Sequence, residues 1–219
     1  MNDELILAWD RRRFLTQASL GAVAFLTPGA FAEALQRTPR QTEGPFFPDQ
    51  LPLDTDNDLL IINDNLTPGV GQVTHLSGIV KDLKGNPIRN ALVEIWQVDG
   101  NGVYLHSKAP KENQDKNFQG YGRFSTDSKG RYYFRTVKPV TYPGRAPHIH
   151  VAVSKQGKRL LTSQCYIEGE EKNSQDFLYQ KLKAPAQKLL TVDFKPLPNS
   201  QTHELTAKWN LIIGLTPEE

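Results

Sequence analysis

The chain has 219 residues, of which 38% are hydrophobic and 23% are charged, and its 26 basic and 24 acidic residues leave a formal net charge of +2. This length favours one domain with a hydrophobic core of its own. The near balance of charges excludes a strongly basic nucleic-acid-binding protein and an acidic disordered tail. Cys165 is the single cysteine, which excludes an intramolecular disulfide framework and a metal site built from several thiolates.

The N-terminal residues have the layout of an export signal. Arg11–Arg13 precede an uncharged stretch that ends in Ala30-Phe31-Ala32, small residues of the kind found before a signal-peptidase cut. Paired arginines followed by Phe-Leu are typical of twin-arginine signals. The stretch contains glycine and proline and is too weakly apolar for a stable membrane span. We therefore predict a twin-arginine-type signal peptide over residues 1–32, with the protein exported to the periplasm or the medium. A basic amphipathic helix of the mature protein is the alternative.

The rest of the chain reads as β structure. Residues 33–72 contain five prolines and predict an N-terminal arm. Residues 73–219 alternate β-prone runs with Gly- and Asn-rich turns, which predicts an all-β fold, an antiparallel β-sandwich with long loops and at most short helices. Residues 174–182 have helical spacing of their apolar side chains. The predicted strands cover residues 75–81, 91–98, 123–126, 131–137, 148–153, 159–167 and 206–213.

The sharpest local motif is Pro147-His148-Ile149-His150, inside a predicted strand. Side chains two residues apart on a strand point to the same face, so the two imidazoles could share one metal ion. A pair of surface histidines on an exposed strand would look the same, and the motif alone supports both interpretations equally. Tyr104 and Tyr142 could add phenolate oxygens, hard ligands that suit ferric iron better than zinc. Each tyrosine by itself would normally be a packing residue.

Several ordered motifs over Thr42–Ile167 together resemble the intradiol ring-cleavage dioxygenase family. The matching stretches are Thr42-Glu-Gly-Pro-Phe-Phe47, Gly78-Ile-Val-Lys-Asp82, Ala91-Leu-Val-Glu-Ile-Trp-Gln97, Asp99-Gly-Asn-Gly-Val-Tyr104, Asn117-Phe-Gln-Gly-Tyr-Gly-Arg-Phe-Ser-Thr-Asp127, Gly130-Arg-Tyr-Tyr-Phe-Arg-Thr136, Tyr142-Pro-Gly-Arg-Ala-Pro-His-Ile-His150 and Gln164-Cys-Tyr-Ile167. Their order and spacing make this signal far more specific than the His-x-His pair.

The resemblance implies a non-haem Fe(III) centre and an oxygenase. Its metal ligands fall on four residues of this chain, Tyr104, Tyr142, His148 and His150. The implied reaction joins O2 to a catechol and cleaves the ring between its two hydroxyl-bearing carbons, giving a cis,cis-muconate. In the family pattern Tyr142 also accepts a substrate proton, and Arg145 stabilises negative charge. Gln164 is the third residue that the pattern assigns to catalysis.

Compared with the family pattern, the chain has a shorter segment beside the expected substrate site. Only residues 143–147 separate Tyr142 from His148, where protocatechuate-type members usually carry a longer insertion, so we expect a more open pocket. The expected partners are a catechol-type small molecule and O2, and a homo-oligomer is compatible with the sequence. Two other hypotheses stay open: a non-catalytic β-sandwich ligand-binding module, and a zinc-dependent hydrolase that uses the two histidines.

Overall fold

The computed structural model describes residues 35–63 and 66–214, all of which belong to the compact unit that begins at Leu35. The predicted signal peptide, residues 1–32, lies outside the described residues and stays a prediction. In the described ranges no helix is both long enough and apolar enough to cross a membrane.

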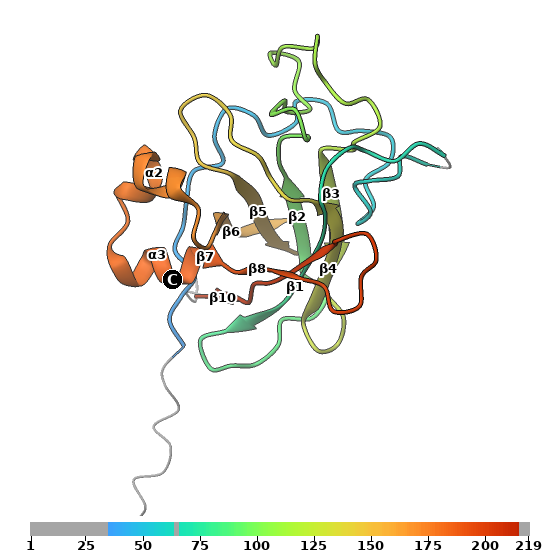
Figure 1. The fold of residues 1–219 in the computed structure, drawn as a ribbon. Coiled ribbons are helices and arrows are strands. Elements are labelled where there is room, and N and C mark those ends of the chain that lie inside the picture. Colours follow the sequence, from blue (N-terminus) through green and yellow to red (C-terminus); the bar gives the residue numbers. More distant parts are fainter. Residues whose placement is uncertain (1–34, 64–65, 215–219) are drawn as a thin grey trace, which may run out of the picture. The chain divides into compact units, whose positions relative to one another are not determined.

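Two sheets and a few short helices make up the fold (Figure 1). In the first sheet, β1 (Val73–Asp82) pairs with β4 (Arg131–Val137), β9 (Leu205–Lys208) and β10 (Leu211–Ile213), and β8 (Phe194–Pro196) pairs with β9. The order in the second sheet is β3 (Tyr121–Ser125), β2 (Leu92–Trp96), β5 (His148–Lys155), β6 (Lys158–Ile167) and β7 (Thr191–Val192). The helical elements are η1 (Glu171–Gln175), α2 (Phe177–Gln180) and α3 (Ala184–Leu190).

The predicted all-β class is confirmed, but the sheets are mixed rather than wholly antiparallel. β9 and β10 both run parallel to β1, and β7 runs parallel to β6. The single strand predicted over residues 206–213 is broken at Trp209, whose N–H donates to the carbonyl of Ser77 at 2.8 Å. Gly78 permits this close approach, because a Cβ atom there would lie 1.8 Å from the Trp209 carbonyl oxygen. The interruption lets one chain segment pair with two successive parts of β1.

Strand β5 is buried on both faces. Ile149, Val151 and Val153 point between the two sheets and join the main hydrophobic core. His148 and His150, which alternate with them, lie on the opposite face and are each 2% exposed. This face is covered by loops instead of a sheet. The alternation therefore separates an apolar core from a polar, loop-covered site on one strand.

The helix predicted over residues 174–182 is interrupted. Asp176 has an extended backbone, with φ of −79° and ψ of 117°, and stands between η1 and α2. Its carboxylate accepts the N–H groups of Leu178 and Tyr179 and so caps α2. Sequence spacing suggested continuous helix, but the aspartate begins a new one.

The predicted arm contributes to the core through two side chains, Leu59 and Leu60, which are 0% and 1% exposed. Both belong to the cluster that fills the space between the sheets. The same segment is tied to β4, because Arg135 donates to the carboxylate of Asp58 at 2.9 Å.

Truncating the buried leucine of the arm should destabilise the fold. We expect Leu59→Ala to lower the free energy of unfolding by about 2–5 kcal/mol, through lost burial and a residual cavity. The matched control is Leu53→Ala in the same segment, where the leucine is 101% exposed; its effect should stay within about 0.5 kcal/mol. Urea unfolding measures both variants, and equal effects would show that the arm does not pack as described.

Candidate metal centre

Three donor atoms from the sequence motifs meet in a buried cluster. The Tyr104 hydroxyl oxygen lies 3.3 Å from His148 Nε2 and 3.1 Å from His150 Nε2. The two Nε2 atoms are 3.1 Å apart. Tyr104 is 4% exposed, so the three atoms face one another away from bulk water.

Local structure explains how Tyr104 reaches the two histidines. A tight turn precedes it, in which the Asp99 carboxylate accepts the N–H groups of Asn101 and Val103 at 2.9 Å. Gly102 in that turn has a φ of +81°, a left-handed conformation that glycine adopts without strain. The turn directs the following tyrosine over the loop-covered face of β5.

Tyr142 and Arg145 are the ends of a second tight turn. Pro143 and Gly144 occupy its centre, Gly144 has a φ of +80°, and Arg145 N–H donates to the Tyr142 carbonyl at 3.0 Å. Proline followed by a left-handed glycine is typical of a type II turn. The turn sets the two side chains next to each other, with Arg145 Nη1 3.5 Å from the Tyr142 hydroxyl. The Tyr142 ring lies edge-on to that of Tyr104, with 5.3 Å between ring centroids.

The Arg145 guanidinium is held by a buried polar network. Its Nη2 donates to Gln164 Oε1 at 2.6 Å, and its Nε donates to Asp176 Oδ2 at 2.8 Å. Gln164 lies opposite His150 in the β5–β6 register, and its amide donates to the carbonyl of Thr42. All six site residues predicted from sequence therefore fall in one connected region of the molecule.

Burial controls the charge of these groups. It lowers the pKa of His148 to about 4 and holds the pKa of His150 well below its ordinary value, where the His148 charge adds to the effect. Burial also raises the pKa of Tyr104 well above 10, and the neighbouring Tyr142 raises it further. For Arg145, burial lowers the pKa but the hydrogen bond and charge of Asp176 outweigh it and raise the pKa. At neutral pH the histidines are thus neutral and Arg145 is charged.

The donor set fits a small metal cation. Protein nitrogen and oxygen ligands bind such ions at about 2.0–2.2 Å, which brings neighbouring ligand atoms to about 3 Å of each other, the spacing found here. His148 Nδ1 donates to the Ala146 carbonyl at 2.7 Å, so Nε2 carries the lone pair that a metal needs. The buried Nδ1 of His150 has no hydrogen-bond partner. Within residues 35–63 and 66–214, no group of three or more His, Cys, Asp or Glu side chains is arranged to hold a metal. The cluster described here has only two such residues, His148 and His150, and its third donor is the phenol of Tyr104.

Aromatic rings wall this cluster, and the sequence motifs did not assign them a role. The Trp96 indole stacks on His150 with 4.7 Å between ring centroids and 7° between planes. Phe46 stacks on Tyr104 at 5.0 Å and 15°. Asp176 was also missed, although an aspartate before Phe-Leu-Tyr is a helix-capping signal that could have drawn notice to it.

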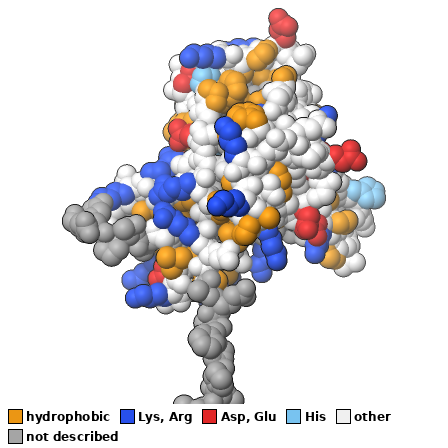
Figure 2. Space-filling view, turned by 90° about the vertical axis from the view of Figure 1, so that its left-hand side faces the viewer, with side chains coloured by type: hydrophobic (Ala, Val, Ile, Leu, Met, Phe, Trp, Pro, Cys, Tyr) orange, Lys and Arg blue, Asp and Glu red, His pale blue; other side chains and the backbone are white. Residues whose placement is uncertain are grey.

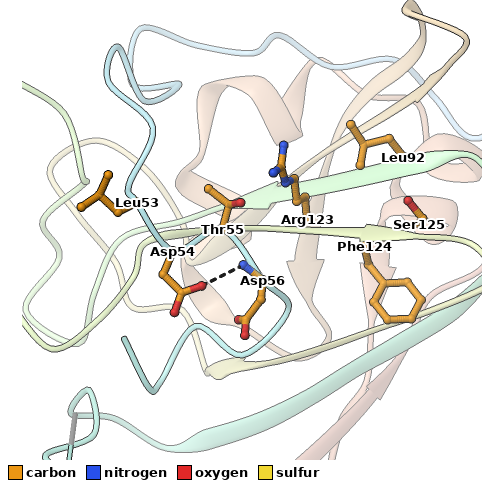
Figure 3. A pocket seen from close by; sticks show the side chains of 8 residues that line it. All are labelled: Leu53, Asp54, Thr55, Asp56, Leu92, Arg123, Phe124 and Ser125. Carbon is orange, nitrogen blue, oxygen red and sulfur yellow. Dashed lines mark hydrogen bonds between the residues drawn. The ribbon is translucent and has the colours of Figure 1, made fainter. Parts of the chain in front are cut away.

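A groove of about 370 Å³ borders the site and is lined by residues 141–146 together with Lys172, Gln175 and Asp176. It opens beside Tyr142 and Arg145, which makes it the candidate substrate entrance. A second hollow, of about 620 Å³, lies elsewhere, against the arm and strands β2 and β3 (Figure 3). The Asp56 backbone N–H there donates to the Asp54 carboxylate at 3.3 Å, and no predicted site residue lines that hollow.

Comparison with known proteins places the chain in a family. The dioxygenase family model matches residues 42–213. The chain belongs to the intradiol dioxygenase family. It is 34% identical over 154 residues to the protocatechuate 3,4-dioxygenase beta chain of Burkholderia cepacia, covering 66% of this chain and 65% of that one. It is 32% identical over 160 residues to catechol 1,2-dioxygenase of Acinetobacter baylyi, covering 65% and 50%.

Solved structures agree with the fold. The dioxygenase domain of a dioxygenase carbohydrate-binding fusion from Streptomyces sp. SirexAA-E superposes with a TM-score of 0.63 at 26% identity, covering 83% of this chain and 100% of that one. Catechol 1,2-dioxygenase from Acinetobacter sp. ADP1 superposes with a TM-score of 0.64 at 24% identity, covering 95% and 70%. Among the curated relatives, by contrast, the chain spans 65%, 56% and 50% of the first three matched.

The buried histidines should make the stability of the metal-free protein depend on pH. The unfolded chain protonates His148 near pH 6.5, whereas the folded protein does so only near pH 4, so protons favour unfolding between these values. The contribution is complete above pH 6.5 and falls as pH drops toward 4, by up to about 3 kcal/mol. Urea unfolding in the presence of chelator measures this loss.

A variant without the imidazole tests the assignment. His148→Gln should unfold with a shallower dependence on pH over that interval. The control is His203→Asn, which removes an exposed histidine and keeps a residue that tolerates the positive φ of 55° found there. An unchanged slope in His148→Gln would contradict the burial of a neutral imidazole at this position.

Proposed function

We propose that the protein is a non-haem Fe(III) intradiol dioxygenase that uses O2 to cleave catechol-type rings to cis,cis-muconate-type products. One observation supports this beyond family membership: Tyr104, His148 and His150 turn their donor atoms toward a single point in a buried site. Tyr142 stands beside them at the groove. A β-sandwich that only bound a ligand would have no need to collect two phenols and two neutral imidazoles around one position.

In this proposal Tyr104, His148, His150 and Tyr142 hold the iron. The chemistry that ferric iron supplies when bound is withdrawal of electron density from a catecholate, which opens the ring to reaction with O2. Hard phenolate donors suit the ferric ion, and the two histidines are already neutral because they are buried. Trp96 and Phe46 hold two of the ligand rings by stacking and exclude water from that side.

Tyr142 is the ligand best placed to take part in proton transfer. It is half-buried, unlike Tyr104, and it lines the groove through which a catechol would enter. A catechol must lose two protons to bind through both oxygens; Tyr142, which would hold the iron as a phenolate, would accept one of them and become a neutral phenol. Arg145 Nη1 faces the Tyr142 hydroxyl oxygen and would stabilise negative charge developing on substrate or phenolate. Gln164 would fix the guanidinium through its 2.6 Å hydrogen bond.

Charged side chains of both signs surround the groove. Lys and Arg side chains gather on the side of the molecule that carries α2 and α3 (Figure 2). Lys172 lines the groove itself, and exposed Lys181, Lys183 and Lys188 follow in the same helical segment. Glu168, Glu170 and Glu171 directly precede Lys172, so the segment as a whole carries no excess of positive charge.

The visible spectrum and O2 consumption test the function. The purified, iron-loaded protein should be coloured by tyrosinate-to-iron charge transfer and should consume O2 with at least one of catechol, protocatechuate and hydroxyquinol. Tyr104→Phe and Tyr142→Phe should lose the band, whereas the control Tyr133→Phe, an exposed tyrosine on β4, should keep it. A colourless zinc protein with hydrolase activity, or a coloured protein inert toward all three catechols, would refute the proposal.

Export is a separate proposal that rests on the sequence of residues 1–32. We expect the protein to reach the periplasm or medium when it is expressed in a bacterium with a twin-arginine system. Replacing Arg11 and Arg12 together with lysine should leave it in the cytoplasm, because the signal is read through its arginine pair. Cell fractionation with immunoblotting measures this. Equal export of the double variant would show that the stretch is not a twin-arginine signal.

A further inference from the structure

We propose that Asp176 is a positioning residue for the reaction: its carboxylate fixes Arg145 beside Tyr142 and, through the backbone of Ala146, fixes the orientation of His148. The inference rests on the proposed function and adds to the site a residue that the sequence motifs did not contain. Asp176 lies in the segment between β6 and α2, outside the two strands and the turns that carry the other site residues.

The first link is an ion pair that is almost fully buried. Asp176 Oδ2 accepts a hydrogen bond from Arg145 Nε at 2.8 Å, and the side chains are 0% and 8% exposed. With Nε held there, Nη2 reaches Gln164 Oε1 and Nη1 faces the Tyr142 hydroxyl. The planar guanidinium has a fixed geometry, so fixing one edge orients the others. Removing Asp176 would leave an uncompensated buried cation free to turn toward the ring of Phe177, which already lies 5.6 Å from Arg145 Cζ.

The second link runs through the backbone of one residue, Ala146, whose N–H and carbonyl belong to the peptide units before and after its Cα. The same Oδ2 atom accepts the Ala146 N–H at 2.9 Å, and the Ala146 carbonyl accepts the Nδ1–H of His148 at 2.7 Å. The carbonyl thereby keeps the His148 proton on Nδ1 and leaves Nε2 as a lone-pair donor toward Tyr104. Asp176 thus supports a proposed metal ligand and the proposed charge-stabilising arginine from a single oxygen.

The other carboxylate oxygen explains why aspartate is needed. Oδ1 accepts the N–H groups of Leu178 and Tyr179 at 2.9 and 3.0 Å. All four partners of the carboxylate are therefore N–H donors. An asparagine in either amide orientation would direct its own NH2 group at two of them, so the isosteric replacement cannot satisfy the site.

The test is Asp176→Asn in the iron-loaded protein. We expect kcat with the best catechol to fall about 10- to 100-fold, because Arg145 is misplaced, while KM changes less than about threefold and iron content is kept. Tyr179→Phe is the matched control: it removes a 3.0 Å hydrogen bond from α2 to Thr191 without touching Arg145, and kcat should be unchanged. If Asp176→Asn does not fold, Asp176→Ser, whose hydroxyl can still cap α2, is measured in the same way.

A double-mutant cycle shows whether Asp176 acts through Arg145. In an Arg145→Ala background the further change Asp176→Asn should cost less in kcat than it does in wild type, because the link through Arg145 is gone and only the link to His148 remains. The proposal is overturned if Asp176→Asn keeps kcat within twofold of wild type. It is also overturned if kcat falls only in proportion to iron content, or if the full loss persists without Arg145 while the His148 tautomer is unchanged.

Nitrogen-15 NMR of the histidines in metal-free protein gives a readout that does not depend on activity. Wild type should hold His148 as the Nδ1–H tautomer, and Asp176→Asn should populate the Nε2–H tautomer as well. If the wild-type protein turned over no catechol, the proposed function would fail, and this measurement alone would decide: an altered tautomer supports the role of Asp176, and an unchanged one overturns it.

Discussion

The site depends on the two-residue period of β5. Ile149 and Val151 are driven into the core between the sheets by the burial of apolar surface, and this forces His148 and His150 onto the other face. A shift in register of one residue would exchange the two sets, placing imidazoles in an apolar core and isoleucine in the site. The energy that holds the histidines in place therefore comes largely from neighbours that do no chemistry.

Burial also determines the protonation states of the site residues. The loops over β5 exclude water, so the imidazoles stay neutral and the Tyr104 phenol resists ionisation. The phenolate form that binds a metal is costly here until a cation shares the site. The charged groups beside the cluster, Arg145 and Asp176, compensate each other. In the proposed function, the centre would favour a cation and its anionic ligands together over either of them alone.

The sequence predicted strands most accurately where local β propensity alone determines them. β4 was predicted with its observed bounds, because Tyr, Phe and Val in alternation have strong β propensity and a Gly-containing turn precedes them. The strand over residues 206–213 was predicted as continuous, because nothing local reveals that Gly78, far away in the chain, allows Trp209 to approach β1. Helix α3 was not predicted, since its polar residues and Pro185 carry weak apolar spacing, and it packs at the edge of the second sheet.

The site residues likewise divide into those set by local geometry and those set by packing between distant segments. The spacing of His148 and His150 predicts that they share one face of a strand, because local geometry alone sets this, but their role and the other four site residues were assigned from the family resemblance. Asp176 lies 31 residues from Arg145 in the chain, and its role depends on where the helical segment packs against the turn at Tyr142. His148 is consequently held from two directions, by the core through β5 and by the helical segment through the Asp176 carboxylate, which also holds Arg145. Displacement of η1 or α2 would reach the proposed metal ligands without altering the strand that bears them.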